Sequence, residues 1–338
     1  MVSVTTLDSE PDTAFFQERV RPFNPFEDDL YRLEIYRWEE EVYLFKDFHH
    51  LVDDGLSEGV FFEDVMKAFT GETLVDESYT AYDFALYEQE LRNSDRYEEA
   101  ERYFDGLLEG LESFKYPYSH VLDEADEKKG SLTVEISATD QINRFCQQLG
   151  ITANAYFQTV ATQVMHRLTR EDNVVMATIS NGRALSQMQH IIGMFVKTLP
   201  LVYKHADEIK TCEEAAKQMH KQNAETISRD FYPFTEMTQR HGIYPEILYA
   251  YQGGVTDSVN TDEDSGIESI PVTLDTAKMP IELTFAPNEQ GHYVVLITWD
   301  TACYNHHDME VLAKAMATYA ANASRNGMML ADIEMLPP

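Results

Sequence analysis

The sequence is poor in basic residues and in cysteine. Its 338 residues include 26 Lys or Arg against 59 Asp or Glu, a formal net charge of −33 at pH 7. Proteins that bind a phosphate backbone or an anionic membrane surface need a basic footprint, so we expect neither a nucleic acid nor a membrane as partner. Cys146, Cys212 and Cys303 are far apart and form no CxxC pair and no zinc spacing. We expect them to be buried free thiols of a protein in a reducing compartment.

Long apolar runs and several cofactor motifs are also missing. No apolar stretch approaches the ~20 residues of a membrane helix, and the N-terminus has no basic region followed by an apolar run. We therefore expect a cytoplasmic protein. No HExxH, P-loop or GxGxxG motif occurs, so neither a bound metal nor an intrinsic cofactor is expected. Hydrophobic residues make up 43% of the chain, which is enough for a sizeable core.

The hydrophobic periodicity predicts a mixed α+β fold within the α/β class, organised in two halves. The predicted strands are 30–37, 41–49, 131–136, 173–180, 195–203, 246–252, 280–286 and 292–299, and the predicted helices are 58–69, 80–92, 96–111, 139–149, 154–169, 211–228 and 306–325. Gly150 is expected to cap a helix, and Pro200 to end a strand. The polar, turn-prone segment 116–130 is the best linker candidate, which predicts an N-terminal domain 1–122 and a C-terminal domain 123–338.

Two adjacent histidines give the strongest chemical signal. In FHHLVDDG, residues 48–55, a predicted strand ends in His49 and His50 and continues into an acidic turn before a helix. An imidazole can accept and donate a proton near neutral pH. Asp54 is placed to brace the turn or cap the helix, and Gly55 permits backbone geometry that other residues resist. A plain surface pair beside a helix N-terminus remains an open interpretation.

A second pattern overlaps the first. Residues 55–59, GLSEG, match the GxSxG nucleophile elbow, with Asp275 or Asp300 and His306 as the conceivable triad partners of Ser57. A nucleophile elbow follows its strand directly, whereas polar residues intervene here. We therefore expect Ser57 in the first turn of a helix, and His306-His307 likewise at the start of the last helix.

In order along the chain, these segments resemble the condensation domain of nonribosomal peptide synthetases. FHHLVDDGLS (48–57) is similar to the HHxxxDG motif of that family, and SNGRALSQMQHIIGMFVKTLPLV (180–202) to its next conserved segment. The segments 24–37, 231–237, 247–253 and 298–320 extend the resemblance over about residues 24–325.

The resemblance implies two chloramphenicol-acetyltransferase-like lobes in a V-shaped arrangement, with the first lobe incomplete and a substrate tunnel between them. It implies condensation of an acyl or peptidyl thioester with an aminoacyl amine, both carried on the 4'-phosphopantetheine arms of carrier domains beside adenylation modules. His50 is then the residue at the acceptor amine, as general base or orienting group. His49, Asp54 and Gly55 support it, and Asn181, Arg183 and Gln252 are expected along the tunnel.

Departures from the family pattern leave two alternatives open. The arginine that the family pairs with the motif aspartate is expected before residue 1, so Arg19 and Arg21 are the candidates here. Lys197 stands where asparagine is usual, and Val202 where arginine is usual. The alternatives are a weakly active domain that only docks carrier proteins, and a free-standing acyltransferase acting on a small amine or alcohol.

Overall fold

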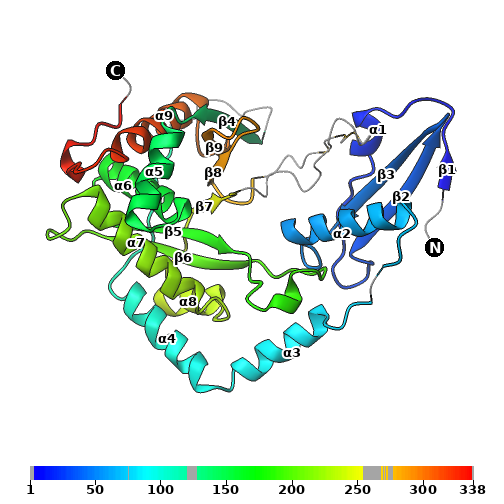
Figure 1. Ribbon diagram of the computed structural model, residues 1–338, viewed down its shortest axis with the longest axis horizontal. Coiled ribbons are helices and arrows are strands. Elements are labelled where there is room, and N and C mark those ends of the chain that lie inside the picture. The colour runs from blue at the N-terminus through cyan, green and yellow to red at the C-terminus, as the bar shows by residue number, and fades with distance from the viewer. Residues whose placement is uncertain are drawn as a thin grey trace. The chain divides into compact units, whose positions relative to one another are not determined.

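The computed structural model describes residues 4–74, 76–119, 128–253, 268, 270, 272 and 277–336. The chain forms two compact units (Figure 1). The first comprises Met1–Tyr87, Arg183–Val196 and Asp257–Leu274, and the second Glu88–Gly182, Lys197–Thr256 and Asp275–Pro338. These units differ from the predicted division at residue 122. The helix α4 (Asp95–Leu108) belongs to the second unit, where Phe104 stacks on Tyr232 with ring centroids 5.8 Å apart.

The first unit contains a three-stranded sheet in the order β1 (Val4–Thr6), β2 (Tyr31–Trp38), β3 (Glu41–Phe48). The strands β2 and β3 form the predicted antiparallel hairpin, and β1 is parallel to β2. Side chains alternate between the faces of a strand. One face packs Tyr36 and Phe45 against Phe16 of α1 (Thr13–Gln17). On the other face, Phe48 contacts Phe61 of α2 (Gly55–Phe69) at 5.3 Å between ring centroids.

The segment 183–196 leaves the second sheet and completes the first unit. It contains the short 3-10 helix η1 (Ser186–Met188). Its buried side chains Met188, Ile191 and Phe195 form a cluster with Phe84 of α3 (Ala81–Leu91). This packing places a sequence-distant loop beside the start of α2, which matters for the site described below.

The second unit is built on a mixed six-stranded sheet with the order β4-β9-β8-β7-β5-β6. Its strands are β4 (Lys129–Glu135), β5 (Asn173–Ser180), β6 (Lys197–Lys204), β7 (Ile247–Tyr251), β8 (Ile281–Pro287) and β9 (Tyr293–Asp300). The remaining elements are α5 (Thr139–Leu149), α6 (Ala153–Thr169), α7 (Cys212–Ile227), α8 (Phe234–His241), α9 (His306–Ala323) and η2 (Leu330–Asp332). The helix α6 packs on β5, β6 and β7, and α9 packs on β4 and β9 (Figure 1).

Most predicted elements are confirmed, with ends displaced by a few residues. Gly150 caps α5 in the left-handed conformation at φ 66°, as predicted. The prediction that Pro200 ends its strand is wrong, because β6 continues to Lys204. A proline is tolerated there because β6 is an edge strand of the sheet. One side of an edge strand has no neighbouring strand, so a missing N–H on that side removes no hydrogen bond.

The periodicity missed α1, β1, α8 and η2, which are all short. The centre of the predicted linker, residues 120–127, lies outside the described residues, and its last residues Lys129 and Gly130 belong to β4. All three cysteines are free; Cys146 and Cys212 are buried as expected, whereas Cys303 is half-buried.

Candidate active site

The His50 side chain is held in a defined tautomer by the turn that follows β3. Its Nδ1 lies 2.6 Å from the main-chain carbonyl oxygen of Asp53. A carbonyl oxygen can only accept, so Nδ1 carries the proton and donates it. In the neutral ring, Nε2 then bears the free electron pair. His50 is exposed, so this electron pair is available to a substrate proton.

His49 faces the inside of the same turn. Its Nδ1 accepts a hydrogen bond from the Leu51 main-chain N–H at 3.0 Å. The main-chain N–H of His49 donates to the Leu30 carbonyl oxygen at 2.9 Å. The ring packs edge-on against Phe23, with ring centroids 5.7 Å apart. These contacts fix the path of the chain between β3 and α2, which in turn sets the position of His50.

Asp54 is the N-cap of α2 and the centre of a buried polar network. Its Oδ1 accepts hydrogen bonds from the Ser57 N–H at 2.8 Å and from the Arg183 guanidinium at 3.0 Å, and its Oδ2 accepts from the Phe195 N–H at 3.0 Å. The side chains of Asp54 and Arg183 are both fully buried. Arg183 also donates to the carbonyl oxygen of Ile191 at 2.9 Å, so it ties the segment 183–196 to α2.

The network keeps the Asp54 carboxyl ionised. Burial on its own raises the pKa of Asp54, but the hydrogen bonds from the Phe195 and Ser57 N–H groups and from Arg183 outweigh it, and the net pKa is lowered. The N-terminal end of α2, with its partial positive charge, favours the anion in the same direction.

The structure corrects two expectations about this motif. The arginine that pairs with Asp54 is Arg183; Arg19 instead lies over the Phe15 ring, with its Cζ 3.3 Å from the ring centroid, and Arg21 donates no side-chain bond to Asp54. Arg183 was predicted along a substrate tunnel, but its side chain is fully buried in the ion pair. Sequence separation hid this pair, because its members are 129 positions apart in the chain.

Gly55 also differs from its predicted role. It is the first residue of α2, and its φ lies outside the left-handed region that favours glycine. A Cβ built on it meets no described atom within 4 Å. The prediction that Gly55 is needed for its own backbone conformation is therefore wrong, and its lack of a side chain leaves open space beside the turn.

Ser57 has structural partners rather than the surroundings of a nucleophile. As predicted, it lies in the first turn of α2 and is fully buried. Its hydroxyl accepts from Arg183 at 2.7 Å and from the Gly193 N–H at 3.0 Å, and lies within donating distance of Asp54 and the Gly193 carbonyl. A serine activated for attack needs a neighbouring general base and an accessible hydroxyl. This geometry does not support the hydrolase interpretation; Asp275 lies outside the described residues.

The other predicted tunnel residues belong to the second unit. Asn181 is exposed at the end of β5, and Gln252 is exposed directly after β7, where its N–H donates to the Phe285 carbonyl at 2.9 Å. Lys197, in place of the usual asparagine, forms an ion pair with Glu88. Val202, in place of the usual arginine, is buried in the core. His306 and His307 start α9 behind the N-cap Asn305, as predicted.

Asp53 is the site residue that sequence reasoning missed. It is only 5% exposed, and its Oδ1 has no hydrogen-bond partner among the described residues. Burial raises the pKa of Asp53 to about 6, against the attraction of Lys46. The signal was present in the sequence as a second aspartate at a variable position of the HHxxxDG pattern, but its burial depends on the packing of α2.

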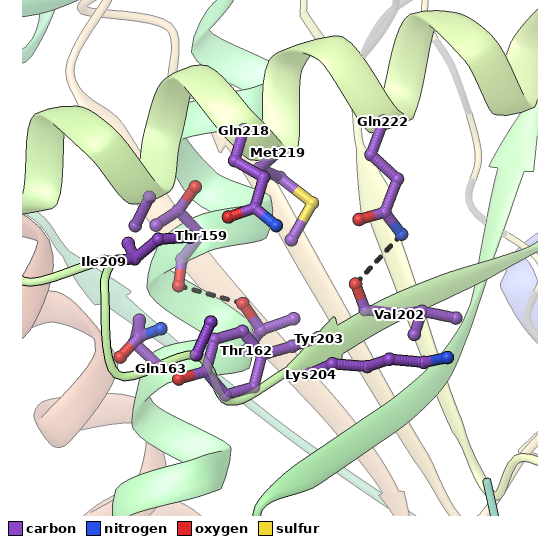
Figure 2. Close-up of a pocket in the computed structure, with 12 residues that line it drawn as sticks. Thr159, Thr162, Gln163, Val202, Tyr203, Lys204, Ile209, Gln218, Met219 and Gln222 are labelled. Carbon is purple, nitrogen blue, oxygen red and sulfur yellow. Dashed lines mark hydrogen bonds between the residues drawn. The ribbon is translucent and has the colours of Figure 1, made fainter. Parts of the chain in front are cut away.

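A crevice in the second unit lies between α6, α7 and β6 (Figure 2). Hydroxyl and amide groups line it, including Thr159, Thr162, Gln218 and Gln222. Its volume of about 30 Å³ holds about one water molecule, which is far too little for a substrate. Its lining offers no carboxylate or imidazole.

The described part of the chain holds no group of three or more His, Cys, Asp or Glu side chains arranged for a metal ion. None of its helices combines the length and the apolar character needed to cross a membrane.

Comparison with known proteins identifies the class to which this fold and motif belong. The family model described as "Condensation domain" matches residues 2–337, and the chain belongs to this family. The X-domain from teicoplanin biosynthesis, solved in complex with OxyB, superposes with a TM-score of 0.80 at 14% identity, covering 100% of this chain and 80% of that one. The condensation domain from the monacolin K polyketide synthase MokA superposes with a TM-score of 0.75 at 15% sequence identity, covering 97% of this chain and 80% of that one.

The fold is therefore the mixed α+β fold of condensation domains, which is chloramphenicol-acetyltransferase-like. Among sequence relatives, tyrocidine synthase 3 of Brevibacillus parabrevis is 22% identical over 334 residues, covering 94% of this chain. The chain spans only 5% of the length of that relative.

Proposed function

We propose that this chain condenses a carrier-bound acyl or peptidyl thioester with a carrier-bound aminoacyl amine, in the cytoplasm and as part of nonribosomal peptide synthesis. The single observation that carries the proposal is the 2.6 Å contact between His50 Nδ1 and the main-chain carbonyl oxygen of Asp53, which assigns the ring proton to Nδ1. This hydrogen bond leaves the Nε2 electron pair for the amine proton. Family membership supports the same chemistry.

The reaction then needs only positioned substrates and one proton acceptor. The acceptor amine attacks the thioester carbonyl carbon while Nε2 of His50 takes the amine proton. The tetrahedral adduct expels the phosphopantetheine thiolate, to which His50 returns the proton. No covalent enzyme intermediate is required, which agrees with the fully engaged Ser57 hydroxyl. In this proposal Asn181 and Gln252 line the substrate path, and Gly55 leaves room beside the turn for the pantetheine arm.

The test is amide formation from two loaded carrier domains with wild type, His50→Asn and His292→Asn. Asparagine keeps a donor near the position of Nδ1 but has no proton acceptor equivalent to Nε2. We expect His50→Asn to lower the rate by about 100-fold or more, within the range of general-base catalysis. His292, in an exposed turn of the second unit, is the matched control and should leave the rate unchanged. Equal product yields from wild type and His50→Asn contradict the proposal.

A docking function is the second candidate, since one structural neighbour was solved in complex with OxyB. A docking domain binds its partner equally well with His50 or asparagine and yields no amide above the uncatalysed background. The same variants, measured for carrier binding and for product, separate the two functions. A free-standing acyltransferase instead accepts a small amine or alcohol without any acceptor carrier.

A further inference from the structure

The buried carboxylate of Asp53 lies in the turn that holds His50. The main-chain carbonyl of Asp53 accepts the Nδ1 proton of His50, so the ring is bound to residue 53 itself. The Asp53 side chain is 5% exposed, with Oδ1 unpartnered among the described residues. A buried carboxylate without full hydrogen bonding costs folding free energy. Buried ionisable groups with strongly shifted pKa values cluster at functional sites.

The charged groups around Asp53 come from three places. Lys46 on β3 attracts its carboxylate, Glu58 on α2 and Asp54 in the turn repel it, and His50 attracts it when protonated. Lys46 is shared, because its Nζ lies 3.2 Å from Glu58 Oε1. Asp54 is occupied by Arg183. His50 is thus the neighbour of Asp53 whose charge changes during the proposed reaction.

We propose that Asp53, rather than the motif aspartate Asp54, is the acidic positioning residue of His50. Its carbonyl fixes the tautomer, and its carboxylate stabilises the imidazolium that forms when Nε2 takes the amine proton. Asp53 forms no covalent bond to a substrate and transfers no proton. The proton passes from the amine to His50 and then to the leaving thiolate. This inference rests on the proposed function for its catalytic meaning, whereas the electrostatic coupling of the two side chains is independent of turnover.

The coupling is tested without turnover, by following the Asp53 carboxyl carbon by NMR during a pH titration. The variants are His50→Asn and, as matched control, His292→Asn, whose histidine lies in the second unit. We expect the Asp53 midpoint to move to higher pH in His50→Asn, because the attraction of His50 for the carboxylate is lost, and to stay in place in His292→Asn. An unchanged midpoint in His50→Asn overturns the inference.

The catalytic role is tested with Asp53→Asn, and Asp64→Asn serves as the control because Asp64 is a partly exposed acid on α2 that pairs with Lys67. We expect kcat for amide formation to fall roughly 10-fold to 100-fold in Asp53→Asn with KM for both carriers unchanged, since a nearby charge alters proton affinity by such factors. The pH profile should also lose its Asp53-dependent limb near pH 6. Wild-type kcat in Asp53→Asn overturns the catalytic role, as does a loss explained by raised KM and lower thermal stability.

Failure of the two proposals is distinguishable. If wild-type protein forms no amide from loaded carriers, the proposed function fails, and with it the catalytic role of Asp53. The titration still decides whether the two side chains are coupled. If wild type is active and His50→Asn is not, but Asp53→Asn behaves as wild type, the proposed function stands and this inference is wrong.

Discussion

The buried ion pair between Asp54 and Arg183 predicts a strong and non-additive effect on stability. Both side chains are fully buried, with N and O 3.0 Å apart. At that separation and an effective dielectric constant of about 20, the Coulomb attraction is about 5 kcal/mol. Much of it offsets the desolvation of two charges, so the pair itself adds little, whereas removal of one partner strands the other. We therefore expect Asp54→Asn or Arg183→Met to lower the unfolding free energy of the first unit by about 3–5 kcal/mol each.

The decisive quantity is the double variant. With both charges removed, no stranded charge remains, so the double substitution should cost no more than either single substitution and far less than their sum. Urea unfolding of the first unit can be followed selectively, because the two tryptophans are divided between the units: Trp38 lies in the first and Trp299 in the second. A Trp299→Phe background leaves Trp38 as the reporter. Additive losses, or single losses below about 1 kcal/mol, refute the reasoning that this pair is buried and coupled.

Two further predictions concern titration and glycine. Burial raises the pKa of Asp53 from 3.8 to about 6, so the folded state binds a proton more tightly than the unfolded state, and stability falls as pH rises between these values. Asp53→Asn should therefore raise the unfolding free energy by up to about 3 kcal/mol above pH 7 and by almost nothing below pH 4. If the stability difference between wild type and Asp53→Asn does not change with pH, the carboxylate is not buried without a partner. Gly55→Ala should fold with equal or slightly higher stability yet slow amide formation, whereas Gly130→Ala should cost about 1–3 kcal/mol, because its Cβ lies 2.2 Å from the Trp299 ring. Thermal melts of the two variants check this contrast, and equal melting temperatures count against it.

Sequence patterns predicted the repeating elements well because these depend on local periodicity. The strand 173–180 matches β5 at both ends, and Gly150 caps α5 as expected. Alternation in β8 and β9 places Leu283 and Ile297 in the core through the same rule. The short elements α1 and α8 escaped prediction, because a helix of five or eight residues has too few turns to establish a period.

The partition into units escaped prediction for a different reason. A composition change marks a flexible connection, but it carries no information about where a segment packs. The segment 183–196 joins the first unit through Met188, Ile191 and Phe195, although the chain around it belongs to the second. Such an excursion is set by complementary apolar surfaces brought together only in the folded chain.

The sequence by itself determined the chemistry available to this protein. It placed His49 and His50 at the end of a strand, Asp54 at the start of a helix and Ser57 in its first turn, because strand ends, caps and first turns are local features. Tertiary structure decided the partners: Arg183 for Asp54, a carbonyl for the His50 Nδ1, and burial for Asp53. Those assignments depend on burial and on contacts between residues distant in sequence. Burial determines how much free energy a charge or a bound proton costs or contributes. The residue pattern alone does not show which side chains are buried.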